Sequence, residues 1–256
     1  VMTYSEEWKK TIKRIGRWVD MENSYKTMDL NYMESVWWVF NELWKKGYIY
    51  EGHKSMHICP RCVTPLSNFE VAQGYKDIKD LSVVAKFKLT SKPEFLDSEK
   101  DVFALAWTTT PWTLPGNVAL AVGNDIEYIV VELEDGDEMY ILAKEREEEL
   151  LSDKKYKVKH KLSGQDLVGL SYEPLFPYFE DTKNAFRIVS VDFVSTEEGT
   201  GIVHIAPAFG DDDYEVGKEE DIGWVQHVNM AGKFVDEVKD FAGQQVKPRE
   251  DHTKTD

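Results

Sequence analysis

The chain has 256 residues, with 31 basic and 47 acidic side chains and a formal net charge of −16. Its 42% hydrophobic and 12% aromatic residues are enough for a sizeable core, which excludes wholesale disorder. The apolar runs are too short to cross a membrane and the N-terminus is polar, so we expect a soluble, cytoplasmic protein with no membrane partner. The acidic balance argues against a broad nucleic-acid-binding surface, but it does not exclude a local basic path.

Two amphipathic helices are predicted in the first 50 residues. The first begins at Ser5 as N-cap, and its apolar face repeats at helical spacing through Trp8, Ile12, Ile15 and Val19. The second has an apolar face made by Met33, Val36, Trp37, Phe40 and Trp44. Basic Lys45 and Lys46 and then Gly47 are typical of its C-terminal end.

Most of the remaining chain reads as short strands. Alternating or continuous apolar patterns predict strands at 83–89, 102–110, 118–122, 128–133, 139–144, 156–162, 186–194 and 201–207. Helices are predicted at 144–151 and 211–220. The fold class is therefore mixed α/β and β-rich: a helical segment that leads, near residues 50–60, into a barrel-like domain with peripheral helices.

Cys59 and Cys62 form the knuckle "CPRC", a spacing that supplies two zinc ligands. A structural zinc needs four ligands, and the chain has no second CxxC pair. His53 and His57 lie upstream and offer a way to complete the site. The alternatives are two free thiols or half of a divided site, and we expect the half-site to hold no complete zinc centre.

The stretch "WTTTPWTLPGN" at 107–117 places three threonines between two tryptophans, with prolines that end regular structure. Threonines at a strand end often bond nearby backbone groups, which is a purely structural role. Alternatively, the hydroxyls of Thr108, Thr109 and Thr110 face a small polar substrate, because a hydroxyl both donates and accepts hydrogen bonds.

A second stretch, "GTGIVHIAPAFGDDDYEVG", spans 199–217. His204 lies within a short apolar strand, where a histidine is more often a hydrogen-bonded core residue than a catalyst. Asp211, Asp212 and Asp213 precede a predicted helix, and one carboxylate suffices as a cap. A spare carboxylate in a cleft suits an ammonium group. We find no serine or cysteine nucleophile with a plausible partner.

These two stretches resemble the signature peptides of the editing domain of the isoleucyl-tRNA synthetase family, a large insertion in a class I catalytic domain. "YKTMDLNYMESVWWVF", "HICPRCVTPLSNFEVAQGYKD" and "DFAGQQVKP" resemble the flanking family sequence, so the resemblance runs through nearly the whole chain. The related valyl and leucyl enzymes usually carry T-T-R-P, and Thr110 in place of that arginine points to the isoleucyl member. The resemblance implies a partial catalytic-domain segment at 1–57, an editing (CP1) domain at 58–250 and a tail at 251–256.

The family function implied is hydrolysis of valine wrongly attached to tRNA(Ile), with valyl-adenylate as a further substrate and isoleucine excluded. By resemblance, Thr108, Thr109 and Thr110 hold the terminal ribose, the ester carbonyl and the attacking water. Asp213 binds the α-ammonium group, and His204 borders the side-chain pocket. Trp107, Trp112 and Asn117 shape the wall and the loop.

Other family features are missing from the chain. It has neither a HIGH-type tetrapeptide nor a KMSKS-type loop, so ATP and Mg²⁺ are expected only in other parts of a parent enzyme, and no aminoacylation is expected from this chain alone. The family commonly has a second CxxC pair after the insertion, which explains a half-site at Cys59 and Cys62, with zinc completed in the full-length enzyme. Expected partners are the acceptor end of tRNA(Ile) carrying valine and the rest of the parent enzyme. Three alternatives stay open: a binding fragment without activity, a valyl or leucyl editing domain, and a zinc-knuckle interaction module.

Overall fold

A computed structural model describes residues 2–73, 75–93, 96, 99–134 and 136–247. The chain divides into two compact units, Val1–His53 and Lys54–Asp256. The assignment of the first to a catalytic domain and of the second to an editing domain stays a prediction. None of the helices in the described residues is long and apolar enough to span a membrane.

The first unit contains two helices, α1 (Met2–Arg14) and α2 (Leu30–Lys45). The predicted start of the first helix at Ser5 is wrong, because the helix begins three residues earlier and ends before Ile15 and Val19. The second helix is confirmed. Gly47 follows it with φ of 74° and donates its N–H to the Trp44 carbonyl, as expected for a glycine that ends a helix. No residue of α2 is buried.

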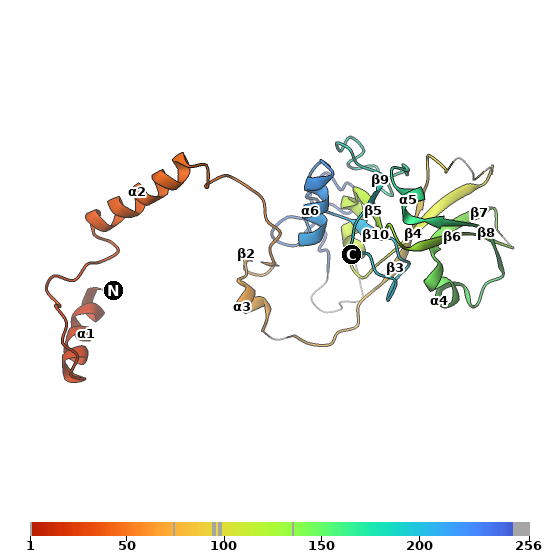
Figure 1. Ribbon diagram of the computed structural model, residues 1–256. Helices are drawn as coiled ribbons and strands as arrows, with labels where there is room; N and C mark the ends of the chain where they lie inside the picture. The colour runs from red at the N-terminus through yellow and green to blue at the C-terminus, as the bar shows by residue number, and fades with distance from the viewer. Residues whose placement is uncertain (1, 74, 94–95, 97–98, 135, 248–256) are drawn as a thin grey trace. The chain divides into compact units, whose positions relative to one another are not determined.

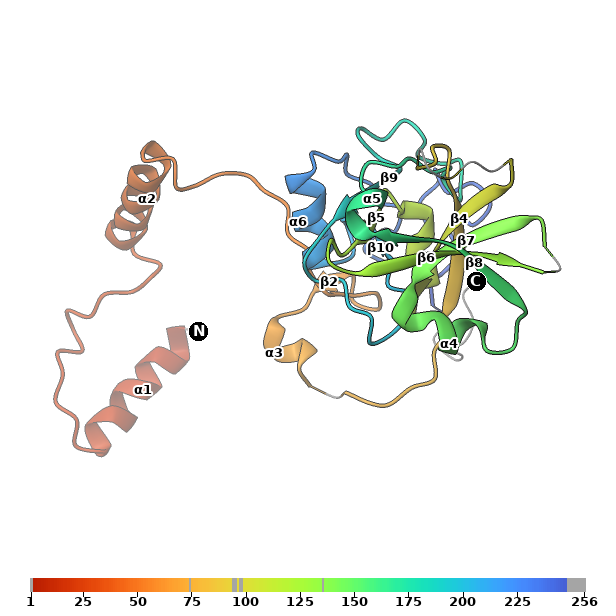
Figure 2. The ribbon, with the colours of Figure 1, turned by 45° about the vertical axis from the view of Figure 1, so that its right-hand side comes forward.

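The second unit carries the sheets and the remaining helices (Figures 1 and 2). Its strands are β1 (Ile58–Cys59), β2 (Thr64–Pro65), β3 (Val83–Lys88), β4 (Asp101–Thr108), β5 (Ala119–Val122), β6 (Glu127–Leu133), β7 (Glu138–Ala143), β8 (Tyr156–Ser163), β9 (Arg187–Ser190) and β10 (Val203–Ile205). Its helices are α3 (Asn68–Val71), η1 (Pro111–Gly116), η2 (Lys144–Arg146), α4 (Glu147–Leu151), α5 (Gly164–Leu167) and α6 (Asp211–Glu219), where η marks a 3-10 helix.

The strands form a five-stranded sheet of order β3-β4-β7-β6-β8, a three-stranded sheet of order β10-β5-β9 and a small β1-β2 hairpin. All pairs are antiparallel except β4 with β7 and β5 with β9, which are parallel. The mixed, β-rich fold class is confirmed. Within the described part of the chain, each sheet is open, so the barrel-like shape comes from two sheets that face each other rather than from one closed ring.

The main core lies between the two larger sheets. Phe87, Ala104 and Tyr128 from the five-stranded sheet share one buried cluster with Leu120 and Ile188 from the three-stranded sheet. Each sheet also buries part of its other face, because α4 covers residues of β6 and β7 (Figure 2) and α6 covers residues of β5 and β10 (Figure 1). Apolar residues that alternate along β4 and run continuously through β5 explain this layering, since β5 has covered faces on both sides.

Candidate functional site

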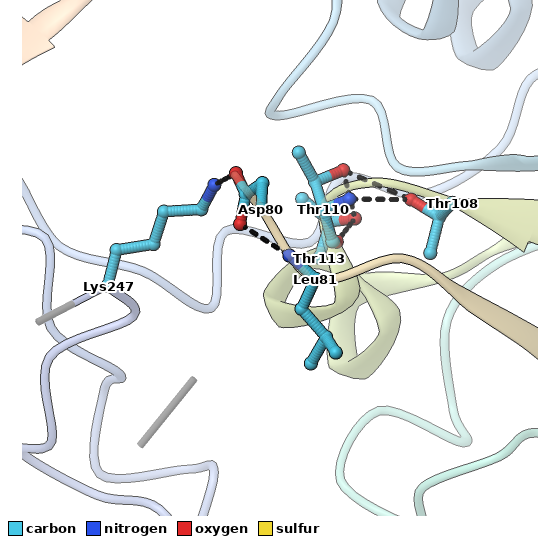
Figure 3. Close-up of polar contacts among 6 residues, drawn as sticks. All are labelled: Asp80, Leu81, Thr108, Thr110, Thr113 and Lys247. Atoms are coloured by element: carbon cyan, nitrogen blue, oxygen red, sulfur yellow. Dashed lines mark hydrogen bonds and ion pairs between the residues drawn. The ribbon is translucent and has the colours of Figure 1, made fainter. Parts of the chain in front are cut away.

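The threonine stretch forms the transition from β4 to η1. Thr108 is the last residue of β4 and is buried, Thr109 is exposed in a bend, and Pro111 is the first residue of η1. The Thr108 Oγ1 atom accepts the backbone N–H of Thr110 at 3.0 Å and lies 3.1 Å from the Thr110 Oγ1 atom. Figure 3 shows this cluster, together with Thr113. The hydroxyls therefore satisfy the backbone where the strand stops, as the structural interpretation expects, and they also gather at one point.

Asp80 and Leu81 lie on the segment that leads into β3 (Figure 3). Val83 pairs with Thr108, so this segment runs beside the threonine end of β4. Asp80 forms an ion pair with Lys247 and accepts the backbone N–H of Leu81 at 2.9 Å. This ion pair joins the segment before β3 to the C-terminal segment of the second unit.

A contact between Thr113 and His204 joins the two sequence stretches. The Thr113 Oγ1 atom lies 2.8 Å from His204 Nε2, and the same hydroxyl donates to the Thr110 carbonyl at 2.7 Å. A hydroxyl has only one hydrogen to donate. Because that hydrogen is used on the carbonyl, the Nε2–H group of His204 must donate to Thr113.

The other side of the His204 ring faces an amide. Asn117 Nδ2 donates to the Ala119 carbonyl at 2.8 Å and lies 3.5 Å from His204 Nδ1. The Tyr172 hydroxyl donates to Asn117 Oδ1 at 2.6 Å, which keeps the amide nitrogen turned toward the ring. The hydrogen bonds therefore assign a neutral imidazole with its proton on Nε2 and an unprotonated Nδ1.

The electrostatics of His204 agree with that assignment. The side chain is buried, and burial, with a smaller contribution from nearby His227, lowers its pKa from 6.5 to about 4. A charged imidazole is disfavoured there because it loses its hydration. His204 is thus neutral at pH 7, with both ring nitrogens already engaged.

Asp213 lies in the first turn of α6, but the helix begins at Gly210 as N-cap. Asp213 Oδ2 accepts the backbone N–H of Ala206 at 3.0 Å, so the carboxylate is tied to the end of β10, two residues beyond His204. Burial raises its pKa from 3.8 to about 6; the Ala206 N–H lowers it and the neighbouring Asp212 raises it. A desolvated carboxylate with one N–H donor retains strong capacity for a cationic partner.

The remaining predicted site residues lie around these groups. Trp107 packs against Gly199, where an added Cβ would lie 3.1 Å from the indole, so the ring and the backbone are in tight contact. Trp112 packs edge-on against Phe209 of the second stretch, with ring centroids 5.3 Å apart. Asn117 is buried and bonded as described. These positions are compatible with the expected wall and loop, and the residues' roles stay predictions.

Sequence reasoning missed three side chains that hold this site. Thr113 stood within the quoted stretch without an assigned role. Tyr172 and His227 lie outside both stretches, in segments without a motif. Both stand among other polar residues, with Ser171 and Glu173 beside Tyr172 and Gln226 beside His227, so the sequence alone offers no signal that selects them.

Cys59 and Cys62 form a tight knuckle between β1 and β2. The Cys59 carbonyl accepts the N–H of Val63 at 2.7 Å. Backbone N–H groups of Cys62 and Arg61 bond the Cys59 thiol and lower its pKa, whereas the adjacent Cys59 raises the pKa of the Cys62 thiol. Over the residues that the structure describes, no group of three or more His, Cys, Asp or Glu side chains is placed to hold a metal ion.

The chain belongs to the class I tRNA synthetases, because the family model for tRNA synthetases class I (I, L, M and V) matches residues 1–253. Among these enzymes it is similar to isoleucine–tRNA ligases. The identity is 50% to that of Bdellovibrio bacteriovorus, 49% to that of Chlamydia trachomatis serovar L2 and 45% to that of Clostridium tetani. Each match covers 96% of this chain and only 23% of the relative's length.

Solved structures similar to this chain include two leucyl-tRNA synthetase editing domains. That of the cytosolic enzyme of P. knowlesi is 16% identical, with a TM-score of 0.43, and the match covers 55% of this chain and 64% of that one. That of P. falciparum is 16% identical, with a TM-score of 0.42 and coverage of 50% of each chain.

Proposed function

We propose that this chain carries an editing site that hydrolyses valyl-tRNA(Ile) and excludes the isoleucyl ester. The observation that supports it most is the hydrogen bond between Thr113 and His204, because it brings the threonine cluster against the strand whose end also anchors Asp213. Hydroxyls for a ribose ester, a neutral wall and a carboxylate for an ammonium group thus belong to one region.

Ester hydrolysis needs a water held near the carbonyl and stabilisation of the charge that develops on oxygen. The hydroxyls of Thr108, Thr109 and Thr110 supply donors and acceptors for the ribose, the carbonyl and the water. A neighbouring ribose hydroxyl serves as a further proton relay, so no protein base is required. His204 does not act as that base, because its Nε2–H donates to Thr113 and its pKa of about 4 leaves it weakly basic.

Selectivity follows from size. One methylene in an apolar pocket contributes about 1–3 kcal/mol, a general value for which isoleucine against valine is the standard example, and this is too little for a single binding step. A second site that admits the smaller side chain and clashes with the larger one supplies the remainder. A rigid, fully hydrogen-bonded His204 is suited to be the wall that clashes.

The chain spans 23% of the length of its curated relatives, so ligation of isoleucine to tRNA with ATP and Mg²⁺ is assigned to other parts of a parent enzyme. We place the acceptor end of charged tRNA(Ile), and also valyl-adenylate, at the threonine cluster. Cys59 and Cys62 supply two of the four ligands of a zinc site whose other ligands come from outside this chain.

The test is release of valine from valyl-tRNA(Ile) by the wild-type chain, by Thr110→Val and by Thr90→Val as a control at an exposed threonine. Wild type and control should hydrolyse the ester, and Thr110→Val should lose most of the rate because it keeps the shape and removes the hydroxyl. Tight binding of a valyl-adenosine analogue without hydrolysis would identify a binding fragment instead. Full activity of Thr110→Val would exclude the threonine site.

A further inference from the structure

His227 lies outside both signature stretches and is completely buried. Its Nε2 atom lies 2.9 Å from the backbone carbonyl oxygen of Trp112. A carbonyl only accepts, so Nε2 carries the proton and donates it. Nδ1 is then an unprotonated acceptor, and the structure gives it no hydrogen-bond partner among the described residues. The His227 ring therefore makes one hydrogen bond, from Nε2 to the carbonyl of Trp112 in η1, and leaves its Nδ1 acceptor unused among the described residues.

The fit between His227 and η1 is tight at a second point. A Cβ added to Gly116, the last residue of η1, would lie 2.1 Å from His227 Nδ1. The edge of the ring therefore occupies the space where any other residue would place its side chain. His227 contacts η1 at both ends, through the Trp112 carbonyl and through Gly116.

The same ring also contacts the second signature stretch. Its centroid lies 4.7 Å from that of Phe209 in an edge-on arrangement, and Phe234 stacks on it at 6.1 Å with an interplanar angle of 21°. Phe209 in turn packs against Trp112. The imidazole thus joins the helix that follows the threonines to the loop that precedes Asp213.

We propose that His227 is a positioning residue of the editing site, which fixes η1, and with it Thr110 and Thr113, through the hydrogen bond to the Trp112 carbonyl. The inference rests on the proposed function. If His227 were only a core residue, the acceptor of its N–H group would not matter for activity, and an apolar side chain of similar shape would replace it without loss of rate. Here the donor is directed at the backbone of the catalytic loop, and the rest of the ring is shaped by Gly116 and Phe209.

Two substitutions separate the donor from the shape. His227→Phe keeps a flat ring and removes the N–H, whereas His227→Gln keeps a side-chain N–H donor with a similar reach. Tyr156→Phe is the control, because it removes a partly buried hydrogen bond, from the Tyr156 hydroxyl to Glu147, at the edge strand β8 of the five-stranded sheet. The measurement is the kcat and KM of valyl-tRNA(Ile) hydrolysis.

We expect kcat of His227→Phe to fall about 10- to 100-fold, the usual effect of a small displacement of catalytic groups. Its KM should stay within about twofold, because the groups that bind the substrate are retained. His227→Gln should recover most of kcat, and Tyr156→Phe should match wild type. Equal kcat for His227→Phe and wild type, or an equal loss for the Phe and Gln variants, overturns the proposal. Absence of hydrolysis by the wild-type chain would instead refute the proposed function.

A second measurement uses only the wild-type chain, so it does not depend on whether a variant folds. The ¹⁵N spectrum of the histidine rings in the wild-type chain at pH 7 should show His227 with a protonated Nε2 and an unprotonated Nδ1. A proton on Nδ1 would remove the bond to the Trp112 carbonyl and overturn the proposal even if His227→Phe fails to fold.

Discussion

Burial drives Asp213 and His204 toward their neutral forms, with different consequences. The pKa of His204 falls to about 4, so the ring stays neutral at every physiological pH. The pKa of Asp213 rises to about 6, so the carboxylate is mostly ionised at pH 7, and no cation from the described residues offsets its desolvation. Under the proposed function, the α-ammonium group of the substrate would supply that cation. One residue is therefore suited to rejecting a side chain and the other to binding a charge.

Asp213→Asn should weaken binding of valyl and isoleucyl esters alike. The asparagine still accepts the Ala206 N–H, but it has no charge for the α-ammonium, which both esters share. A charge-assisted hydrogen bond contributes about 1.5–3 kcal/mol, which corresponds to about 10- to 150-fold in KM. Steady-state deacylation of both esters measures the effect. Unchanged KM for both would mean that the carboxylate only anchors Ala206.

His204→Ala should change selectivity rather than general binding. Removal of the ring enlarges the side-chain pocket and should raise the rate of isoleucyl-tRNA(Ile) hydrolysis relative to that of valyl-tRNA(Ile), while the loss of the Thr113 contact slows both reactions. The ratio of the two kcat/KM values is the measurement. A ratio identical to that of wild type would assign the steric role to another wall residue, with Trp112 the next candidate.

Two elements need glycine at one position each: η1 at Gly116 and the segment before β10 at Gly201, because a Cβ at either position would clash with a neighbour. Gly201 has φ of 75°, and an added Cβ would lie 2.3 Å from the Ala143 Cβ in β7. Its carbonyl accepts the buried Tyr128 hydroxyl at 2.8 Å, which ties the segment to β6. The second stretch therefore reaches β10 through a backbone that only glycine can form.

Gly201→Ala should lower the free energy of unfolding by about 1–3 kcal/mol, through both its positive φ and the clash. Gly169→Ala is the matched control, since Gly169 has φ of 85° but open space around its Cα, so only the backbone cost applies. Urea unfolding compares the two. If both lose the same free energy, the contact with Ala143 contributes nothing.

All the strands that periodicity predicted are present. The burial of a strand determines which of its residues are apolar, as the alternation in β4 shows. Their ends were less predictable. The expected strand at 186–194 stops at Ser190, and that at 201–207 shrinks to Val203–Ile205, because pairing with β5 rather than local preference sets these limits. Pairing depends on residues distant in the sequence.

The candidate site, like the strands, was predictable in part from the sequence. The threonine stretch and the three aspartates stood out by their patterns, whereas the resemblance to the family selected Asp213 among them and gave His204 its role. The Thr113–His204 contact brings the two stretches together. Tyr172 and His227 were not found, because their significance lies in one hydrogen bond each to Asn117 and to Trp112, across 55 and 115 residues. A single sequence contains no trace of such a contact.

For the molecule as a whole, the buried histidines set a pH dependence of stability. Burial lowers the pKa of His204 and of His227 from 6.5 to about 4. As pH falls from 6.5 to 4, the unfolded chain binds protons that the folded chain excludes, so stability decreases over this window and is greatest above it. Asp213 acts in the opposite direction, because its folded pKa of about 6 lies above the usual 3.8 and favours the folded state as pH falls.

His227→Gln should remove its part of this acid dependence. Relative to wild type, the variant should gain on the order of 3 kcal/mol in the free energy of unfolding between pH 6.5 and pH 4, from a shift of about 2.5 pKa units. Urea unfolding across this range gives the difference, and its pH slope is independent of any constant cost of the substitution. Parallel curves for the two proteins would show that His227 is not buried as a neutral ring.

The central claim is that two distant stretches make one site that recognises a valyl ester. A crystal structure of the chain with a non-hydrolysable valyl-adenosine analogue tests it most directly. The account predicts the α-ammonium within hydrogen-bond distance of the Asp213 carboxylate, the valine side chain against His204 and the ribose at Thr108, Thr109 and Thr110. An analogue bound elsewhere, or bound at the threonines with its ammonium turned away from Asp213, would contradict it.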